Sequence, residues 1–223
     1  LNAVAEAIKP DDPHFARTKL LCLENTQAGQ PLPLDYLSDA RSFCNRHNLS
    51  LHLDGARLFN ASVALRVDVK VITQHFDTVS VCLSKGLGAP VGSLLCGPAD
   101  LIKKARRWRK VLGGGMRQAG IIAAAGIHAL DCHVSRLEAD HARARLICEK
   151  LRSLNHPGMQ ISDAQTNMVF ISFHDVDVHA IASRLKEKDI LITPGKRVRL
   201  VTHLDLNDQD VEYFVSEFTK ALD

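Results

Sequence analysis

The sequence VCLSKGLGAPVGSLLCG, residues Val81 to Gly97, joins two short apolar runs through a glycine-rich turn. Three glycines follow Lys85 within seven residues, so the turn has no room for a helix and predicts two adjacent antiparallel strands. Lys85 closes the first run. Open α/β sheets bind ligands beyond the carboxyl ends of their strands, so Lys85 is expected to face a crevice. The alternative is a tight turn that carries an incidental lysine.

Apolar runs with strand character alternate with helical patterns through the first half of the chain. Near-continuous apolar strands between helices predict an α/β fold with a mixed, mostly parallel sheet covered on both faces. Asp54 closes the second run, so Asp54 and Lys85 share one crevice if their strands are neighbours. The expected strands are 19–25, 49–54, 78–84 and 91–97, with a helix through 36–44.

The second half of the chain predicts a smaller α+β unit. A helical pattern covers 117–154, and its apolar stripe includes His141. Helices are expected from near Asp177 and behind the cap residues Asn207 and Asp208. The expected strands are 167–173, 190–193 and 197–202. We predict a part of a major domain at 1–130, a linking helix at 131–157 and a small domain at 158–223.

Composition narrows the function classes. The 223 residues are 46% hydrophobic with a formal net charge of +3, and no basic run is long enough for a nucleic-acid arm. The basic cluster KKARRWRK, at 103–110, predicts a solvated helix face or a rim over an anionic small molecule. No apolar run approaches the ~18 residues of a membrane span. The six cysteines include no C-x-x-C pair, so we predict that they are core residues of the protein and that the protein lies in a reducing compartment, the cytoplasm. No Cys/His cluster has metal-ligand spacing.

A lysine and an aspartate at neighbouring strand ends suit pyridoxal phosphate chemistry. A lysine amine condenses with the aldehyde of this cofactor, and a carboxylate keeps its pyridine nitrogen protonated. Two phosphate motifs fit less well. A P-loop needs glycine before the lysine, but Ser84 precedes Lys85. A dinucleotide fingerprint needs glycine where Val91 stands.

Several longer motifs resemble the low-specificity L-threonine aldolases. They are LHLDGARLFNASVAL at 51–65, the stretch around Lys85, RKVLGGGMRQAGIIAAAGIHAL at 109–130 and RVRLVTHLDL at 197–206. The resemblance covers essentially the whole chain. It implies a pyridoxal-phosphate enzyme of fold type I, the aspartate-aminotransferase fold. It also implies aldol cleavage of L-threonine or L-allo-threonine to glycine and acetaldehyde, in a homo-oligomer that acts on small β-hydroxy amino acids.

The resemblance also implies roles for individual residues. Lys85 corresponds to the lysine that forms a Schiff base with the cofactor, and Asp54 to the partner of its pyridine nitrogen. Arg57 corresponds to an arginine beside the cofactor's phenolic oxygen and the substrate carboxylate. Arg199 corresponds to a second arginine on that carboxylate, a task that suits a guanidinium fork.

Lys110 and Arg117 resemble basic residues that the family places near the active site at a subunit boundary. Two features depart from the family pattern. The Ser-Gly-Thr turn for the cofactor phosphate does not occur in this sequence, which starts at Leu1, so we expect an N-terminally truncated chain. Gln27 stands where the family has a histidine, and glutamine is not a base near neutral pH. Two alternatives therefore stay open: a truncated, non-catalytic relative that is only an oligomerising or vestigial product, and a β-elimination on the same fold.

Overall fold

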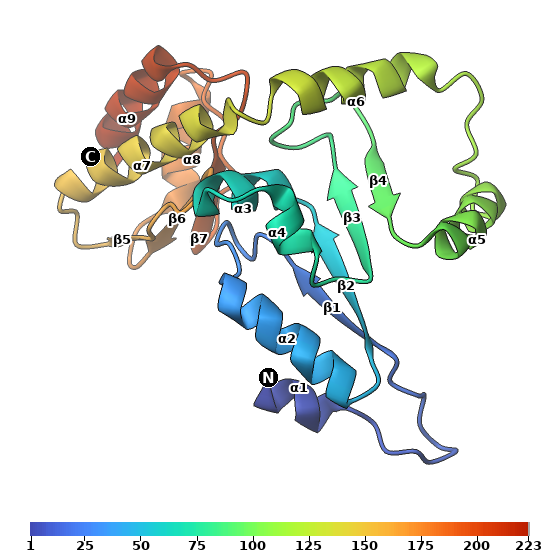
Figure 1. Ribbon diagram of the computed structural model, residues 1–223. Coiled ribbons are helices and arrows are strands. Elements are labelled where there is room, and N and C mark those ends of the chain that lie inside the picture. The colour runs from blue at the N-terminus through green and yellow to red at the C-terminus, as the bar shows by residue number, and fades with distance from the viewer. Residues whose placement is uncertain (223) are drawn as a thin grey trace.

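The computed structural model describes residues 1–222 and contains two β-sheets (Figure 1). The first sheet has the strand order β1 (Leu20–Glu24), β2 (Ser50–Gly55), β3 (Thr78–Cys82) and β4 (Ser93–Cys96). β1, β2 and β3 run parallel, whereas β4 pairs antiparallel with β3. The predicted α/β class is therefore confirmed, as is the tight antiparallel connection around Lys85.

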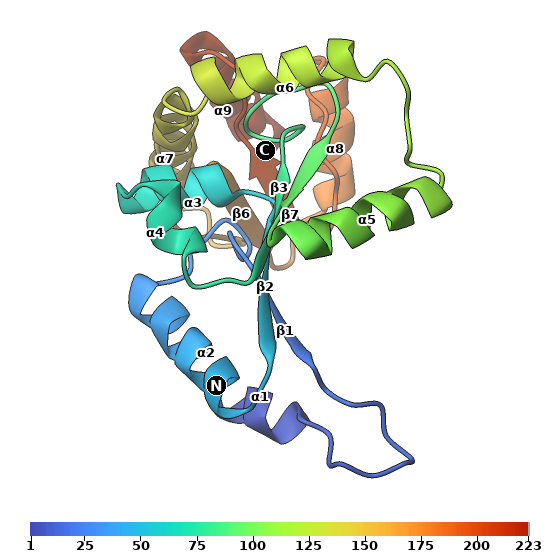
Figure 2. The ribbon, with the colours of Figure 1, turned by 45° about the vertical axis from the view of Figure 1, so that its right-hand side comes forward.

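Helices cover one face of the first sheet. Figure 2 views this sheet nearly edge-on, and α2, α3 and α4 all lie on the same side of it. The helices of this part are α1 (Asn2–Ala7), α2 (Leu34–Arg46), α3 (Leu58–Leu65) and α4 (Val69–Thr73). α2 follows the predicted helical stripe, since Leu37, Ala40, Phe43 and Cys44 are all buried.

The opposite face of the first sheet is largely open within residues 1–222, although the apolar runs predicted that both faces are covered. Side chains alternate between the two faces of a strand, and every second residue of β1 and β2 is at least partly exposed. All four residues of β4 are exposed. The exposed positions include Asp54, so the open face carries one of the candidate site residues.

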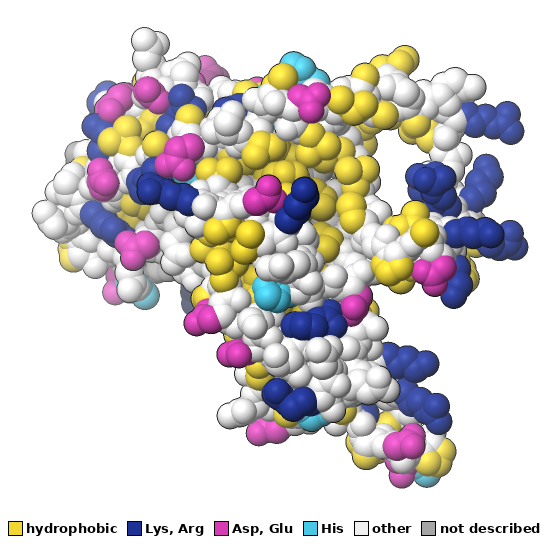
Figure 3. All heavy atoms as spheres, viewed as in Figure 1, with side chains coloured by type: hydrophobic (Ala, Val, Ile, Leu, Met, Phe, Trp, Pro, Cys, Tyr) yellow, Lys and Arg dark blue, Asp and Glu magenta, His cyan; other side chains and the backbone are white. Residues whose placement is uncertain are grey.

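α5 (Ala99–Val111) and α6 (Gly120–Cys132) follow β4 and make few buried contacts. α5 has no buried residue, and Trp108 is 63% exposed. Figure 3 shows lysine and arginine side chains gathered over this helix, at the right of the view. This arrangement fits the solvated basic helix that the KKARRWRK cluster predicts.

The second sheet is antiparallel and is packed against three helices. Its strands are β5 (Met159–Ile161), β6 (Met168–Phe173) and β7 (Arg197–Val201), in that order. α7 (Leu137–Ser153), α8 (Val178–Lys186) and α9 (Asp208–Leu222) share one apolar cluster with it. Asp177 caps α8, and Asn207 caps α9 by accepting from the N–H groups of Gln209 and Asp210.

Two predicted elements differ from the structure. The strand expected at 190–193 is wrong, because no strand is assigned there in the described chain. Asp189 has φ of 60°, the Ile190 N–H donates back to the Leu185 carbonyl, and Pro194 has no N–H to donate, so these residues do not enter the strand ladder although Ile190 and Ile192 pack on the apolar cluster. The helical pattern over 117–154 forms two helices, α6 and α7, and residues 131 and 132 belong to α6.

The prediction that the cysteines are core residues holds only in part. All six are free; Cys44 and Cys148 are buried, whereas Cys22, Cys96 and Cys132 are exposed. Sequence context misled here because those three lie on the open sheet face or on helix surfaces that few residues cover. Over residues 1–222, no helix has the length and apolar character needed to cross a membrane. The division at residues 130 and 158 stays a prediction.

Candidate active site

The carboxyl ends of β2 and β3 bring three predicted site residues together. Asp54 is the next-to-last residue of β2, Arg57 follows that strand, and Lys85 comes three residues after β3. β2 and β3 are hydrogen-bonded neighbours, so all three residues emerge at one edge of the sheet. Asp54 is exposed, and its Oδ1 accepts a hydrogen bond of 3.0 Å from the Ala56 N–H.

The backbone around Lys85 is fixed by its own hydrogen bonds. The Gly88 N–H donates to the Lys85 carbonyl at 2.8 Å, and the Ala89 N–H donates to Leu83 at 3.0 Å. Gly88 has φ of +73°, which favours glycine at this position. Gly86 is buried while the Lys85 side chain is exposed. The turn therefore presents an exposed amine on a hydrogen-bonded backbone.

Arg57 is the residue before the first turn of α3, and the end of β1 holds it in place. Its N–H donates to the Asn25 carbonyl at 3.2 Å, and the Asn25 N–H donates to the Asp54 carbonyl at 2.9 Å. Arg57 Nε is buried and has no hydrogen-bond partner within residues 1–222. A buried donor without a partner is costly, so this atom is suited to a ligand that accepts a hydrogen bond.

The second sheet contributes Arg199 to the same region. Burial lowers the pKa of Arg57, and the positive charge of Arg199 lowers it further, against a smaller opposing effect of Glu24. Arg199 lies in β7 opposite Phe170, and its side chain is exposed. Two arginines that repel one another across two sheets favour an anion between them, such as a carboxylate.

Comparison with known proteins assigns the family. The family model described as beta-eliminating lyase matches residues 1–174. The chain belongs to the beta-eliminating lyase family. It is 51% identical over 211 residues to the low specificity L-threonine aldolase of Escherichia coli K12. The alignment covers 95% of the chain and 62% of that relative. It is 42% identical to a probable low-specificity L-threonine aldolase 2 of Arabidopsis thaliana, over 99% of the chain and 65% of the relative.

Solved structures agree on the fold of this family member. The threonine aldolase of Leishmania major matches with a TM-score of 0.81 at 22% identity, over 99% of the chain and 66% of that structure. A putative L-allo-threonine aldolase of Listeria monocytogenes matches with a TM-score of 0.77 at 19% identity, over 98% and 65%. The predicted fold type I architecture is confirmed. The chain spans about three fifths of the length of its bacterial relatives, 62% for the one named above.

The loop with Gln27 lies between the two sheets of this beta-eliminating lyase family member. Gln27 and Gln30 exchange backbone hydrogen bonds of 2.9 Å, and the Gln27 side chain is exposed. Thr166 Oγ1 donates to the Gly29 carbonyl at 2.6 Å, which ties the loop to the segment before β6. A Cβ at Gly29 would lie 2.8 Å from the Cβ of Met168, so only glycine permits this approach.

Lys110 and Arg117 lie apart from the strand-end residues along the chain. Lys110 is near the end of α5, Arg117 follows that helix, and both side chains are exposed. No hydrogen bond or ion pair joins either of them to Asp54, Lys85 or Arg199 in the described chain. Their predicted position at a subunit boundary stays a prediction.

Sequence reasoning missed two residues behind the Lys85 turn. Asn60, one helical turn after Arg57, and His141, on α7, are both buried and hydrogen-bonded to one another. The signal for His141 was its place on an otherwise apolar stripe of the predicted helix. Asn60 gave no such signal, because asparagine is common on helix surfaces.

Proposed function

We propose that the protein to which this chain belongs is a pyridoxal-phosphate-dependent aldolase. It cleaves L-threonine or L-allo-threonine to glycine and acetaldehyde, a reaction of the carbon–carbon lyases. The observation that carries the proposal is the buried, unpartnered Nε of Arg57 beside the charge of Arg199, at the strand edge where Asp54 and Lys85 emerge. The names of the sequence relatives support the same reaction.

The residues at this edge fit pyridoxal phosphate. Lys85 offers an exposed amine for the aldehyde carbon, and Asp54 offers an exposed carboxylate for the pyridine nitrogen. Arg57 offers a hydrogen-bond donor that no atom of residues 1–222 uses. When bound, the cofactor supplies an electron-accepting ring that stabilises negative charge on the substrate's α-carbon.

The side chains of this chain would orient the substrate. Arg57 and Arg199 together can hold its carboxylate through charge-assisted hydrogen bonds, which fix the direction of the bond to be cleaved. Asp54 offers a carboxylate at the same strand ends. Gln27 can donate or accept a hydrogen bond at the β-hydroxyl but does not take its proton near neutral pH. We therefore propose that another base or a water molecule accepts that proton.

We also propose a homo-oligomer, a dimer or a tetramer, in a reducing compartment such as the cytoplasm. The exposed apolar residues of α5 and the loop after it support an interface, since Trp108, Val111, Leu112 and Met116 are each more than 60% exposed. Lys110 and Arg117 lie in the same segment and would reach the site of a neighbouring subunit. The six free cysteines support the reducing compartment.

The test of cofactor binding is chemical trapping. The chain is incubated with pyridoxal phosphate, treated with borohydride, digested and analysed by mass spectrometry for a modified Lys85. We expect the modification in the wild type and its absence in Lys85→Ala. Lys70→Ala, which removes an exposed lysine on α4, is the matched control and should keep it. A wild-type chain without any adduct on Lys85 contradicts cofactor binding by this chain.

The test of the reaction is product analysis. Threonine is expected to give glycine and acetaldehyde in equal amounts, with no product from Lys85→Ala. The description of the family model favours β-elimination as the second candidate, which would give pyruvate and ammonia from serine. Pyruvate as the main product from serine, without glycine from threonine, would replace the first proposal by the second. Cofactor binding without either product would favour the non-catalytic alternative.

A further inference from the structure

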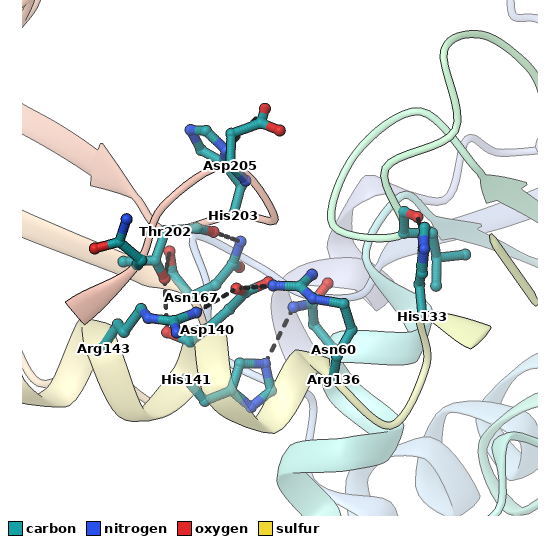
Figure 4. A network of polar contacts seen from close by, with 12 residues as sticks. Asn60, His133, Arg136, Asp140, His141, Arg143, Asn167, Thr202, His203 and Asp205 are labelled. Carbon is teal, nitrogen blue, oxygen red and sulfur yellow. Dashed lines mark hydrogen bonds and ion pairs between the residues drawn. The ribbon is translucent and has the colours of Figure 1, made fainter. Parts of the chain in front are cut away.

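A buried polar pair lies behind the Lys85 turn. Asn60 on α3 and His141 on α7 are 2% and 0% exposed, and Asn60 Nδ2 lies 3.0 Å from His141 Nε2 (Figure 4). Leu137 packs beside Asn60 at Gly86, and the buried Asp140 with its partner Arg136 adjoins His141 on the other side. A buried polar pair adds little to stability compared with a well-packed hydrophobic pair, so stability alone does not account for this one.

Asn60 touches the residue next to Lys85. A Cβ placed on Gly86 would lie 2.9 Å from Asn60 Oδ1 and 3.1 Å from Leu137 Cδ2, so the amide of Asn60 is packed directly against the Gly86 backbone. His133 supports the same turn, since its Nδ1 lies 2.7 Å from the Leu87 carbonyl oxygen. The turn that carries Lys85 is thus supported from α3 and from the segment before α7.

α7, the helix that carries His141, also contacts the strand that carries Arg199. The carbonyl of Asp140, the residue before His141, accepts a 2.7 Å hydrogen bond from Thr202 Oγ1. Thr202 directly follows β7, and its backbone N–H pairs with Asn167 at 3.0 Å. The Asp140 carboxylate is buried and paired with Arg136. Figure 4 shows these side chains side by side along α7, between the two sheets.

We propose that Asn60 and His141 are positioning residues for Lys85. Hydrogen bonds between buried groups have preferred directions, whereas apolar contacts permit sliding, so this pair fixes where α7 meets the Lys85 turn. Since Asp140 on the same helix holds Thr202, α7 relates the position of the Lys85 amine to that of Arg199. What Lys85 binds rests on the proposed function, but the support of its turn does not.

The first test follows the turn itself, without cofactor. Hydrogen–deuterium exchange of residues 83–89 reports on it, because the N–H groups of Leu83, Gly88 and Ala89 are hydrogen-bonded there. We expect Asn60→Leu and His141→Leu to speed this exchange about tenfold. His141→Gln keeps a hydrogen-bonding group near the position of Nε2 and should restore slow exchange. If Asn60→Leu does not fold, Asn60→Ser replaces it, and we expect the same faster exchange of residues 83–89.

The second test follows the cofactor. Circular dichroism in the visible band of the protein–pyridoxal phosphate complex reports how the bound ring is held. We expect its amplitude to fall severalfold in Asn60→Leu and His141→Leu and to recover in His141→Gln. Leu151→Ala is the matched control, because it removes buried volume from the same helix at a residue 1% exposed, far along α7 from the turn. It should lower stability without changing exchange in 83–89 or the dichroism.

The outcomes separate this inference from the proposed function. Unchanged exchange in 83–89 in both leucine variants overturns the positioning role, and so does a His141→Gln variant that behaves like His141→Leu. A wild-type chain that shows no visible band contradicts cofactor binding by this chain, while the exchange experiment still decides whether Asn60 and His141 hold the turn.

Discussion

The first sheet, β1 to β4, spreads its core over three separate clusters, whereas the second sheet, β5 to β7, shares one large cluster with α7, α8 and α9. The first sheet has helices packed closely against one face only, and no residue of its last strand is buried. Parallel strands are normally covered on both faces. The comparison indicates that the second sheet carries more of the stability, while the first sheet carries most of the candidate chemistry.

The same contrast separates the roles of individual residues. Asp54 and Lys85, the best candidates for cofactor contacts, are exposed at the edge of the first sheet. Residues that hold these two in place, such as Asn60 and Leu53, are buried. A site needs unsatisfied groups toward its ligand and satisfied groups behind them. The open edge and the buried support are therefore complementary parts of one arrangement.

Phe218→Ala should have the largest effect, because it removes a fully buried ring from the cluster of the second sheet. We expect the free energy of unfolding to fall by about 3–5 kcal/mol. Leu94→Ala, at a 45% exposed residue of β4, should change it by less than about 0.5 kcal/mol. Urea unfolding followed by circular dichroism measures both. Equal losses would mean that the two sheets contribute alike to stability.

Asp54→Asn tests the exposed edge of the first sheet. The amide keeps an oxygen that can accept from the Ala56 N–H but loses the charge, so we expect unfolding in urea to be unchanged. Threonine cleavage should fall about 10²-fold, because an amide does not stabilise a protonated ring nitrogen. The measurement is glycine formation at saturating cofactor. A variant with wild-type turnover would remove Asp54 from the site.

Arg199→Lys tests what the second sheet adds to the site. A lysine keeps the charge but not the two-pronged contact with a carboxylate. We expect the KM for threonine to rise about tenfold, with kcat changed much less. Arg197→Lys, two residues earlier on the same strand, is the control, since Arg197 packs over the Phe170 ring at 4.1 Å. If both variants raise KM equally, Arg199 has no special role.

The pH dependence of stability should show a smaller effect that arises between the two sheets. Burial lowers the pKa of His141 from its ordinary value of 6.5, with a partial opposing effect of Glu138. The unfolded ring therefore takes up a proton at a higher pH than the folded ring, so stability is retained above pH 6.5 and lost as the pH falls below it. We expect a loss of about 1 kcal/mol.

His141→Gln is the control for this effect, because glutamine does not titrate. Denaturation midpoints of the wild type and of this variant are compared between pH 7.5 and pH 5. The difference between the two curves isolates His141 from the other histidines. Asp77 also has a lowered pKa, but its contribution is lost only below about pH 3.8, outside this range. Parallel curves would mean that His141 is not titrating in this window.

Several elements were predictable because their signals are local. The glycines after Lys85 fixed an antiparallel turn, and the stripe at residues 36–44 fixed α2. Asn207 was recognised as a cap because a side-chain oxygen before a helix satisfies free N–H groups in any fold. The strand at 190–193 failed for the opposite reason. An apolar run shows that residues avoid water but not which partner they find, and this run found no strand.

The sequence by itself determined the class of the fold, the family and the residues that could carry chemistry, because residue types and their spacing along strands set these. The tertiary structure alone decided that His141 reaches Asn60, a residue 81 positions earlier in the chain. No local pattern encodes such a contact. It depends on how α7 and the two sheets pack, and only the packed chain specifies where their side chains meet.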